Sequence, residues 1–149
     1  MEWRGEMNIA NIFGLHIGCR VKHSFTHDNT LREGISLLTG VQILQGGTIL
    51  IEAGFKEYNH QFCKLILKPL SKITDEDKAD FQTTFKIKEK ILGFDISSSD
   101  AVLVCTEFTD FDGDPMDKYD DINYSQLLWL ASKGYDIGLV PDEYKEVTE

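Results

Sequence analysis

Carboxylates gather in one short stretch toward the end of this 149-residue chain. Six aspartates fall within twelve residues: Asp110, Asp112, Asp114, Asp117, Asp120 and Asp121. Two chemistries use carboxylates at such spacing. Alternating carboxylates on a tight loop surround Ca²⁺ with oxygen atoms. A dense group of negative charges instead attracts a basic surface on another protein.

The calcium interpretation rests on a partial fit to the EF-hand loop. Asp110, Asp112 and Asp114 match the first, third and fifth positions of that loop, and Asp121 falls on the twelfth. However, Pro115 stands where the loop requires glycine, and the twelfth position is normally glutamate. The flanking segments do not show paired helices either. We therefore expect a solvated acidic loop that binds a partner, without a metal or other cofactor.

Histidines and a cysteine near the start of the chain suggest a zinc site as a further chemistry. His16, Cys19, His23 and His27 lie close together in sequence. The alternation over residues 19–25 predicts a strand, along which Cys19 and His23 would be about 13 Å apart. That separation is too large for one zinc ion, and no second Cys/His pair completes a tetrahedral set. The pattern favours ordinary core and surface residues.

Enzyme motifs for phosphate binding, nucleophilic serine or zinc catalysis are missing from the sequence. The three cysteines, Cys19, Cys63 and Cys105, are odd in number and widely spaced. This spacing predicts reduced, mostly buried thiols of a cytoplasmic protein. Nothing marks one of them as activated, although a Cys–His nucleophile pair stays open.

Short apolar runs broken by glycine dominate the chain up to about residue 70 and are typical of β-structure. Strands are expected over residues 19–25, 35–44, 48–52 and 62–67. Gly46 and Gly47 can take the positive φ angles of a tight hairpin, and Pro69 ends the last strand. These features predict a small antiparallel sheet, either curled or closed as an SH3-like barrel.

Helix signals appear after residue 73. Thr74 predicts a capped helix to about residue 85, and Asn123 predicts a second over residues 124–133, ended by Gly134. A strand is expected over residues 101–108, residues 91–96 fit either type, and residues 110–121 are expected to be a loop. We therefore predict one α+β domain over residues 1–149. Its β-rich part covers about 15–70, and its helical, acidic part covers about 74–140.

Charge is divided unevenly along the chain. Residues 1–72 carry 8 Lys/Arg and 6 Asp/Glu, or +2, whereas residues 73–149 carry 7 and 19, or −12. The acidic half would repel phosphate backbones, which disfavours direct nucleic-acid binding by that half. No apolar run reaches the ~20 residues of a membrane span, and the first residues lack the pattern of a signal peptide. A cytoplasmic protein without membrane contact is expected.

Three segments resemble parts of small uncharacterised proteins from phages and prophages of Bacteroides-type bacteria. Residues 65–74 (LILKPLSKIT) resemble an LLLRPLSDLT-like segment, residues 129–140 resemble a WL…HFDVFGLI-like ending, and residues 17–21 resemble the opening strand. Lys68 and Lys72 depart from the Arg and Asp of that pattern. The resemblance implies a phage accessory gene acting in a bacterial host cell, and it carries over no catalytic residues.

Together these observations predict a non-enzymatic protein that acts by protein–protein interaction. Its six aspartates would bind the basic surface of a host protein or ribonucleoprotein, as an anti-defence inhibitor of the anti-CRISPR type would. Two alternatives stay open. One is a structural or assembly accessory protein of the phage particle. The other is a small-ligand-binding protein or enzyme that uses its cysteines or histidines. The oligomeric state is not specified by the sequence.

Overall fold

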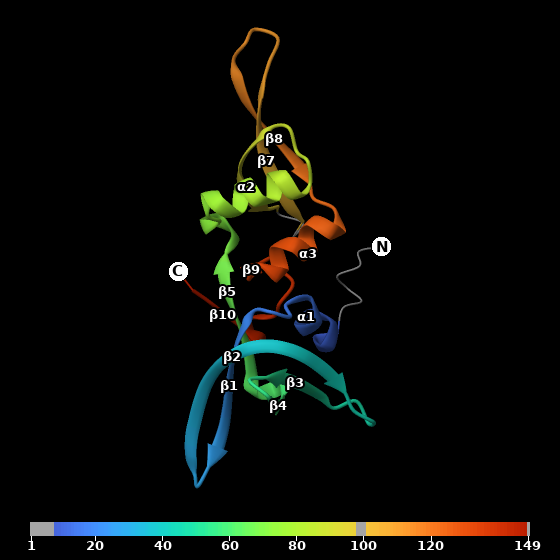
Figure 1. Ribbon diagram of the computed structural model, residues 1–149, viewed down its shortest axis with the longest axis vertical. Helices are drawn as coiled ribbons and strands as arrows, with labels where there is room; N and C mark the ends of the chain where they lie inside the picture. Colours follow the sequence, from blue (N-terminus) through green and yellow to red (C-terminus); the bar gives the residue numbers. More distant parts are fainter. Residues whose placement is uncertain (1–7, 98–100, 149) are drawn as a thin grey trace.

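Two sheets make up the structure, a computed structural model that describes residues 8–97 and 101–148 (Figure 1). The described strands are β1 (Arg20–His27), β2 (Thr30–Ile43), β3 (Ile49–Ala53), β4 (Lys56–Asn59), β5 (Cys63–Pro69), β6 (Lys90–Ile96), β7 (Val102–Thr109), β8 (Pro115–Asp121), β9 (Tyr135–Asp136) and β10 (Lys145–Val147). The α-helices are α1 (Ile9–Leu15), α2 (Asp75–Thr84) and α3 (Tyr124–Ser132), and the 3₁₀ helices are η2 (His60–Phe62), η3 (Leu70–Lys72) and η4 (Asp142–Tyr144). None of these described helices is long and apolar enough to cross a membrane.

The larger sheet has the strand order β10-β5-β1-β2-β3-β4, and β9 also pairs with β5. The strands β1 to β5 pair antiparallel, whereas β9 and β10 run parallel to β5. β2 pairs with β1 through its first half and with β3 through its second, and a register shift between Leu38 and Gly40 interrupts the pairing with β3 near its start. Such an irregularity bends a strand. β2 is accordingly drawn as a wide arc in Figure 1.

One face of the larger sheet buries an apolar cluster on which α1 packs. The cluster follows the period of two along β5, where Cys63, Leu65 and Leu67 are buried and Lys64 and Lys68 are exposed. Its members are Ile12, Phe13, Val21, Leu38, Ile51, Ala53, Cys63, Leu65, Leu67 and Val140. Val140 and the strands β9 and β10 show that the last part of the chain returns to this sheet.

The smaller sheet consists of β6, β7 and β8 in that order, all antiparallel, with α2 and α3 beside it. A second cluster joins the helices to the sheet through Leu70, Ile73, Phe81, Ile91, Phe94, Val102, Val104, Leu127, Leu130, Ala131, Tyr135 and Ile137. Phe81 lies in the middle of the ring contacts, with centroids of Phe85, Phe94 and Trp129 at 4.8, 4.9 and 5.4 Å. The two helices therefore cover one face of the smaller sheet.

The predicted α+β architecture with a helical C-terminal half is wrong. Besides α2 and α3, that half contains the strands β6 to β10, and strands dominate the described chain as a whole. The largest error concerns residues 110–121, which were expected to be a loop. Aspartate is uncommon in strands, but residues 115–121 pair with β7 over the whole of β8. Backbone pairing with the apolar strand β7 outweighs the low intrinsic preference of this aspartate-rich segment for strand structure.

Other local predictions are confirmed. The expected strands over 19–25, 35–44, 48–52, 62–67 and 101–108 correspond to β1, β2, β3, β5 and β7 with shifted ends. The hydroxyl of Thr74 accepts the Asp77 N–H at 3.1 Å and caps α2. Asn123 and Gln126 form a reciprocal capping box at the start of α3.

Candidate functional site

The acidic stretch forms the outer part of the β7–β8 hairpin. Figure 1 shows this hairpin projecting away from the helices and from the larger sheet. All seven residues of β8 are exposed, and among the described residues β8 pairs with β7 alone. The predicted partner-binding aspartates therefore lie on an extended arm, which we call the acidic arm (residues 107–121).

The turn of the acidic arm is built by one of the six aspartates. One carboxylate oxygen of Asp110 accepts the backbone N–H groups of Asp112 and Asp114, each at 2.9 Å. Gly113 has a φ of +83°, a conformation that glycine adopts without a steric penalty. Asp110 thus has a structural role as a turn residue, while Asp112 and Asp114 are exposed at the tip.

The strand register divides the remaining aspartates between two faces. Asp117 and Asp121 lie on one face of β8, opposite Glu107 and Leu103 of β7. Residues that are direct partners point to the same side of a sheet, and successive residues point to opposite sides. Asp120 therefore lies on the other face, where Lys118 pairs with it at 3.6 Å. The structure brings together Asp117 and Asp121 but not Asp120.

Two more carboxylates join Asp117 and Asp121 on what we call the open face, the side of the smaller sheet away from α2 and α3. Glu107 is the direct partner of Asp117, and Asp95 of β6 is the direct partner of Leu103. Neither Glu107 nor Asp95 was among the predicted binding residues. Glu107 falls inside the strand predicted over residues 101–108. Its position beside Asp117 could not be predicted, because it depends on the register between β7 and β8.

Tyr119 occupies the middle of the open face, directly opposite Cys105. A hydrogen bond with the Cys105 thiol raises the pKa of the Tyr119 hydroxyl, and the nearby carboxylates of Asp117 and Asp95 raise it further. The side chain is about half exposed, at 56%. It therefore presents a neutral aromatic ring within a group of carboxylates, an arrangement that suits a cationic side chain of a partner.

The four aspartates considered as calcium ligands do not lie close together. Asp110 lies at the turn, whereas Asp121 is the last residue of β8, roughly 20 Å farther along the strand. Within residues 8–97 and 101–148, no group of three or more His, Cys, Asp or Glu side chains is arranged to hold a metal ion. The EF-hand aspartates form no such group there, and neither do His16, Cys19 and His23, while the side chain of His27 lies outside the described part of the structure.

The cysteines are free and buried, as predicted. Cys63 lies opposite His23 in the β1–β5 pairing, yet the two do not form a nucleophile–base pair. His23 contacts the Ser36 hydroxyl at 3.0 Å and stacks on Tyr58, while the Cys63 thiol donates to the Asn59 carbonyl at 3.6 Å. Burial raises the pKa of Cys63 to about 12, so this thiol is protonated at neutral pH.

Neither a known protein family, nor a curated protein, nor a solved structure matches this chain. The resemblance to phage and prophage proteins therefore stays a prediction, and the function must be argued from the open face and the acidic arm.

Proposed function

We propose that this protein is a non-enzymatic, phage-type accessory protein that binds a basic protein surface through the acidic arm and the open face. The proposed partner is a host protein or ribonucleoprotein that handles nucleic acid, such as a defence system in the bacterial cytoplasm. Such partners carry basic surfaces that bind phosphate backbones. An acidic protein that occupies this surface would block it, which is the mode of action of an anti-defence inhibitor.

The main support is a charge arrangement that disfavours the isolated fold. Residues 107–121 contain seven carboxylates and one lysine, a net charge of −6. Glu107 and Asp117 are direct cross-strand partners, and like charges in that relation destabilise a sheet. Lys90 is the partner of Glu107 on its other side, but no ion pair joins the two in the described chain. A basic partner would remove this repulsion on binding.

Apolar groups on the same arm support a binding role as well. Phe108 and Met116 are direct partners near the turn, and they are 36% and 47% exposed. Phe111 is fully exposed in the turn itself. Aromatic residues and methionine are enriched at protein interfaces. The arm therefore combines charge for attraction with apolar side chains for close contact.

The test compares two triple variants that remove the same number of charges. The first, Glu107→Gln/Asp117→Asn/Asp121→Asn, neutralises three of the four carboxylates of the open face. The control, Glu57→Gln/Asp80→Asn/Glu89→Gln, neutralises three exposed carboxylates elsewhere. Tagged wild-type protein is used to capture partners from bacterial host lysate at low salt. The captured protein is then purified, and its affinity for all three forms is measured at low and raised salt.

We expect a basic protein whose binding weakens steeply as salt increases, because screening reduces the attraction between exposed charges. The open-face variant should bind at least about tenfold more weakly than the control variant. Equal binding by the two variants, or capture of no basic protein, would contradict the proposal. Self-association of the chain without a host partner would instead favour a role in the phage particle.

A further inference from the structure

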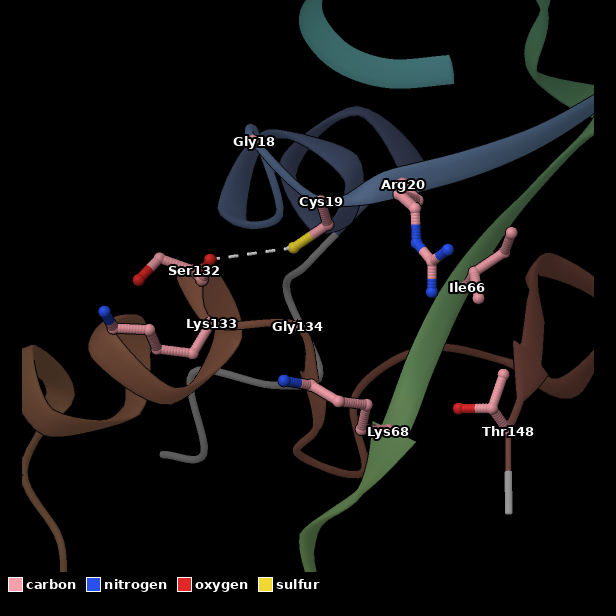
Figure 2. Close-up of a pocket in the computed structure, with 9 residues that line it drawn as sticks. All are labelled: Gly18, Cys19, Arg20, Ile66, Lys68, Ser132, Lys133, Gly134 and Thr148. Atoms are coloured by element: carbon pink, nitrogen blue, oxygen red, sulfur yellow. Dashed lines mark hydrogen bonds between the residues drawn. The ribbon is translucent and has the colours of Figure 1, made fainter. Parts of the chain in front are cut away.

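A hollow of about 210 Å³ lies where β1 and β5 of the larger sheet meet the end of α3 (Figure 2). Three cationic side chains line it: Arg20 at the start of β1, Lys68 in β5 and Lys133 just after α3. None of the residues that line the hollow is a carboxylate. The three cations come from parts of the chain up to 113 residues apart, so the fold itself brings them together.

Among the described residues these cations have no carboxylate partner, in a protein that has 25 acidic and 15 basic residues. Some lysines do form ion pairs, such as Lys22 with Glu33 and Glu146, whereas other exposed lysines such as Lys90 form none in the described chain, so what distinguishes these three cations is that they share one hollow. Gathering three unpaired positive charges around one hollow costs free energy that a bound anion would recover.

A structural role in neutralising the end of α3 does not account for them. Cations often lie near the C-terminus of a helix, where they interact with free carbonyl groups. Here the Ala131 carbonyl already accepts the Cys19 thiol at 3.2 Å and the Gly134 N–H at 3.0 Å. The Leu130 carbonyl accepts the Lys133 N–H at 3.2 Å. The carbonyls of Leu130 and Ala131 are therefore occupied without a lysine ammonium or the Arg20 guanidinium, and the Ser132 carbonyl has the Cys19 thiol at 3.9 Å.

Aromatic rings fix two of the three charges. The Lys68 ammonium lies 4.4 Å from the centre of the buried Tyr135 ring, and the Lys133 ammonium lies 5.1 Å from the Trp129 ring. Figure 2 shows the Arg20 side chain extending from β1 beside Ile66 of β5, and the Lys133 ammonium directed away from Arg20. Rings hold a cation without cancelling its charge. Lys68 and Arg20 therefore present positive charge to the hollow directly, and Lys133 would have to turn from Trp129 to add its own.

We propose that this hollow binds a phosphate group, either as inorganic phosphate or as the phosphomonoester of a small molecule. A phosphate carries a charge of about −1.5 to −2 at neutral pH, which offsets part of the positive charge of the three cations. Arginine binds phosphate through two parallel hydrogen bonds, and lysine binds it as a point charge. The volume is below the roughly 300 Å³ of typical small-molecule sites, so it suits the phosphate group with little else. The acidic arm plays no part in this site.

The direct test is a titration of the whole chain with sodium phosphate, followed by amide NMR at constant ionic strength. We expect saturable shifts for the amides of Gly18 and Gly134, which line the hollow, and none for Gly46 and Gly47 in the β2–β3 turn. Shifts that fail to saturate, or equal shifts at both pairs of glycines, would overturn the proposal. Glycerol phosphate is titrated in parallel. Tighter binding of glycerol phosphate assigns the site to an organic phosphate, and equal binding assigns it to phosphate itself.

Variants provide a second test with a matched control. Arg20→Gln and Lys68→Gln should each weaken phosphate binding at least about tenfold, since each removes a charge-assisted hydrogen bond. Lys64→Gln removes the same charge from an exposed position on β5 outside the hollow and should bind as the wild type does. Equal loss in Lys64→Gln would show a general charge effect and refute the site. If Arg20→Gln does not fold, Lys133→Gln, at an exposed position after α3, replaces it.

Discussion

The repulsion between Glu107 and Asp117 leads to an uncommon expectation, namely that neutralising a residue of the proposed binding surface stabilises the protein. At a cross-strand separation of about 5 Å, two like charges in a water-like dielectric repel by about 0.8 kcal/mol. Salt at physiological strength screens part of this energy, so about 0.5 kcal/mol remains. Asp117→Asn should therefore raise the free energy of unfolding by about 0.5 kcal/mol, whereas most substitutions lower it.

A double-mutant cycle isolates this interaction from the strand preferences of the individual residues. Asp117→Lys replaces repulsion with attraction and should stabilise by about 1 kcal/mol, or roughly 3 °C in Tm. Glu107→Lys gains the same attraction to Asp117 but also places a lysine opposite Lys90, so it should stabilise less. The double variant restores a like-charge pair and should lose that gain. Urea unfolding is measured for the four proteins at low salt and in 1 M NaCl. An Asp117→Lys variant that does not stabilise at low salt, or a coupling energy that persists in 1 M NaCl, would refute the argument.

Three further predictions concern the two cores. Phe81→Ala should lower the free energy of unfolding by about 3–5 kcal/mol, measured by urea denaturation, because Phe81 is fully buried among three aromatic rings; a cost below about 1 kcal/mol would contradict this packing. Burial lowers the pKa of His16 in the folded protein, so the imidazole binds a proton more tightly in the unfolded chain. The contribution of His16 to the free energy of unfolding should therefore be complete above about pH 6.5 and decrease as the pH falls below that value. The His16→Gln variant should reduce the difference in urea midpoint between pH 7.5 and 5.5, and an unchanged difference would show that other groups cause it. Cys63, whose pKa burial raises to about 12, should resist alkylation by iodoacetamide at pH 8 until the protein is unfolded, as mass spectrometry of the labelled peptide would show.

Local patterns predicted those elements whose residues alternate or carry caps. Residues 19–25 and 62–67 alternate, and Thr74 and Asn123 accept hydrogen bonds at helix starts, so β1, β5, α2 and α3 were found close to their true positions. β8 was missed because its stability comes from pairing with β7 and from the Asp110 turn, not from its own composition. A strand of aspartates is understandable only together with its neighbour.

The candidate binding sites, too, depend on contacts between segments that are distant in sequence, and these contacts could not be predicted from local patterns. The sequence located the six aspartates of the acidic arm but gave no basis for separating Asp120 from Asp117 and Asp121. That separation depends on the strand register, which also brings Asp95 to the same face. The hollow with its three cations was not predicted at all, since Arg20 and Lys133 are far apart in sequence. Only the docking of the end of α3 beside β1 and β5 places them together.

The parallel pairing of β9 and β10 with β5 has a consequence for synthesis on the ribosome. β5 is synthesised before the middle of the chain, but the strands that pair with its second edge come from residues 135–147. Until then β5 presents an unpaired edge and part of its apolar face, which is the kind of surface through which partly folded chains aggregate. The larger sheet therefore reaches its final state late, through contacts of high sequence separation that form slowly. A chain that stops before residue 135 should expose this edge permanently, and bacterial expression should yield it mainly as insoluble aggregate.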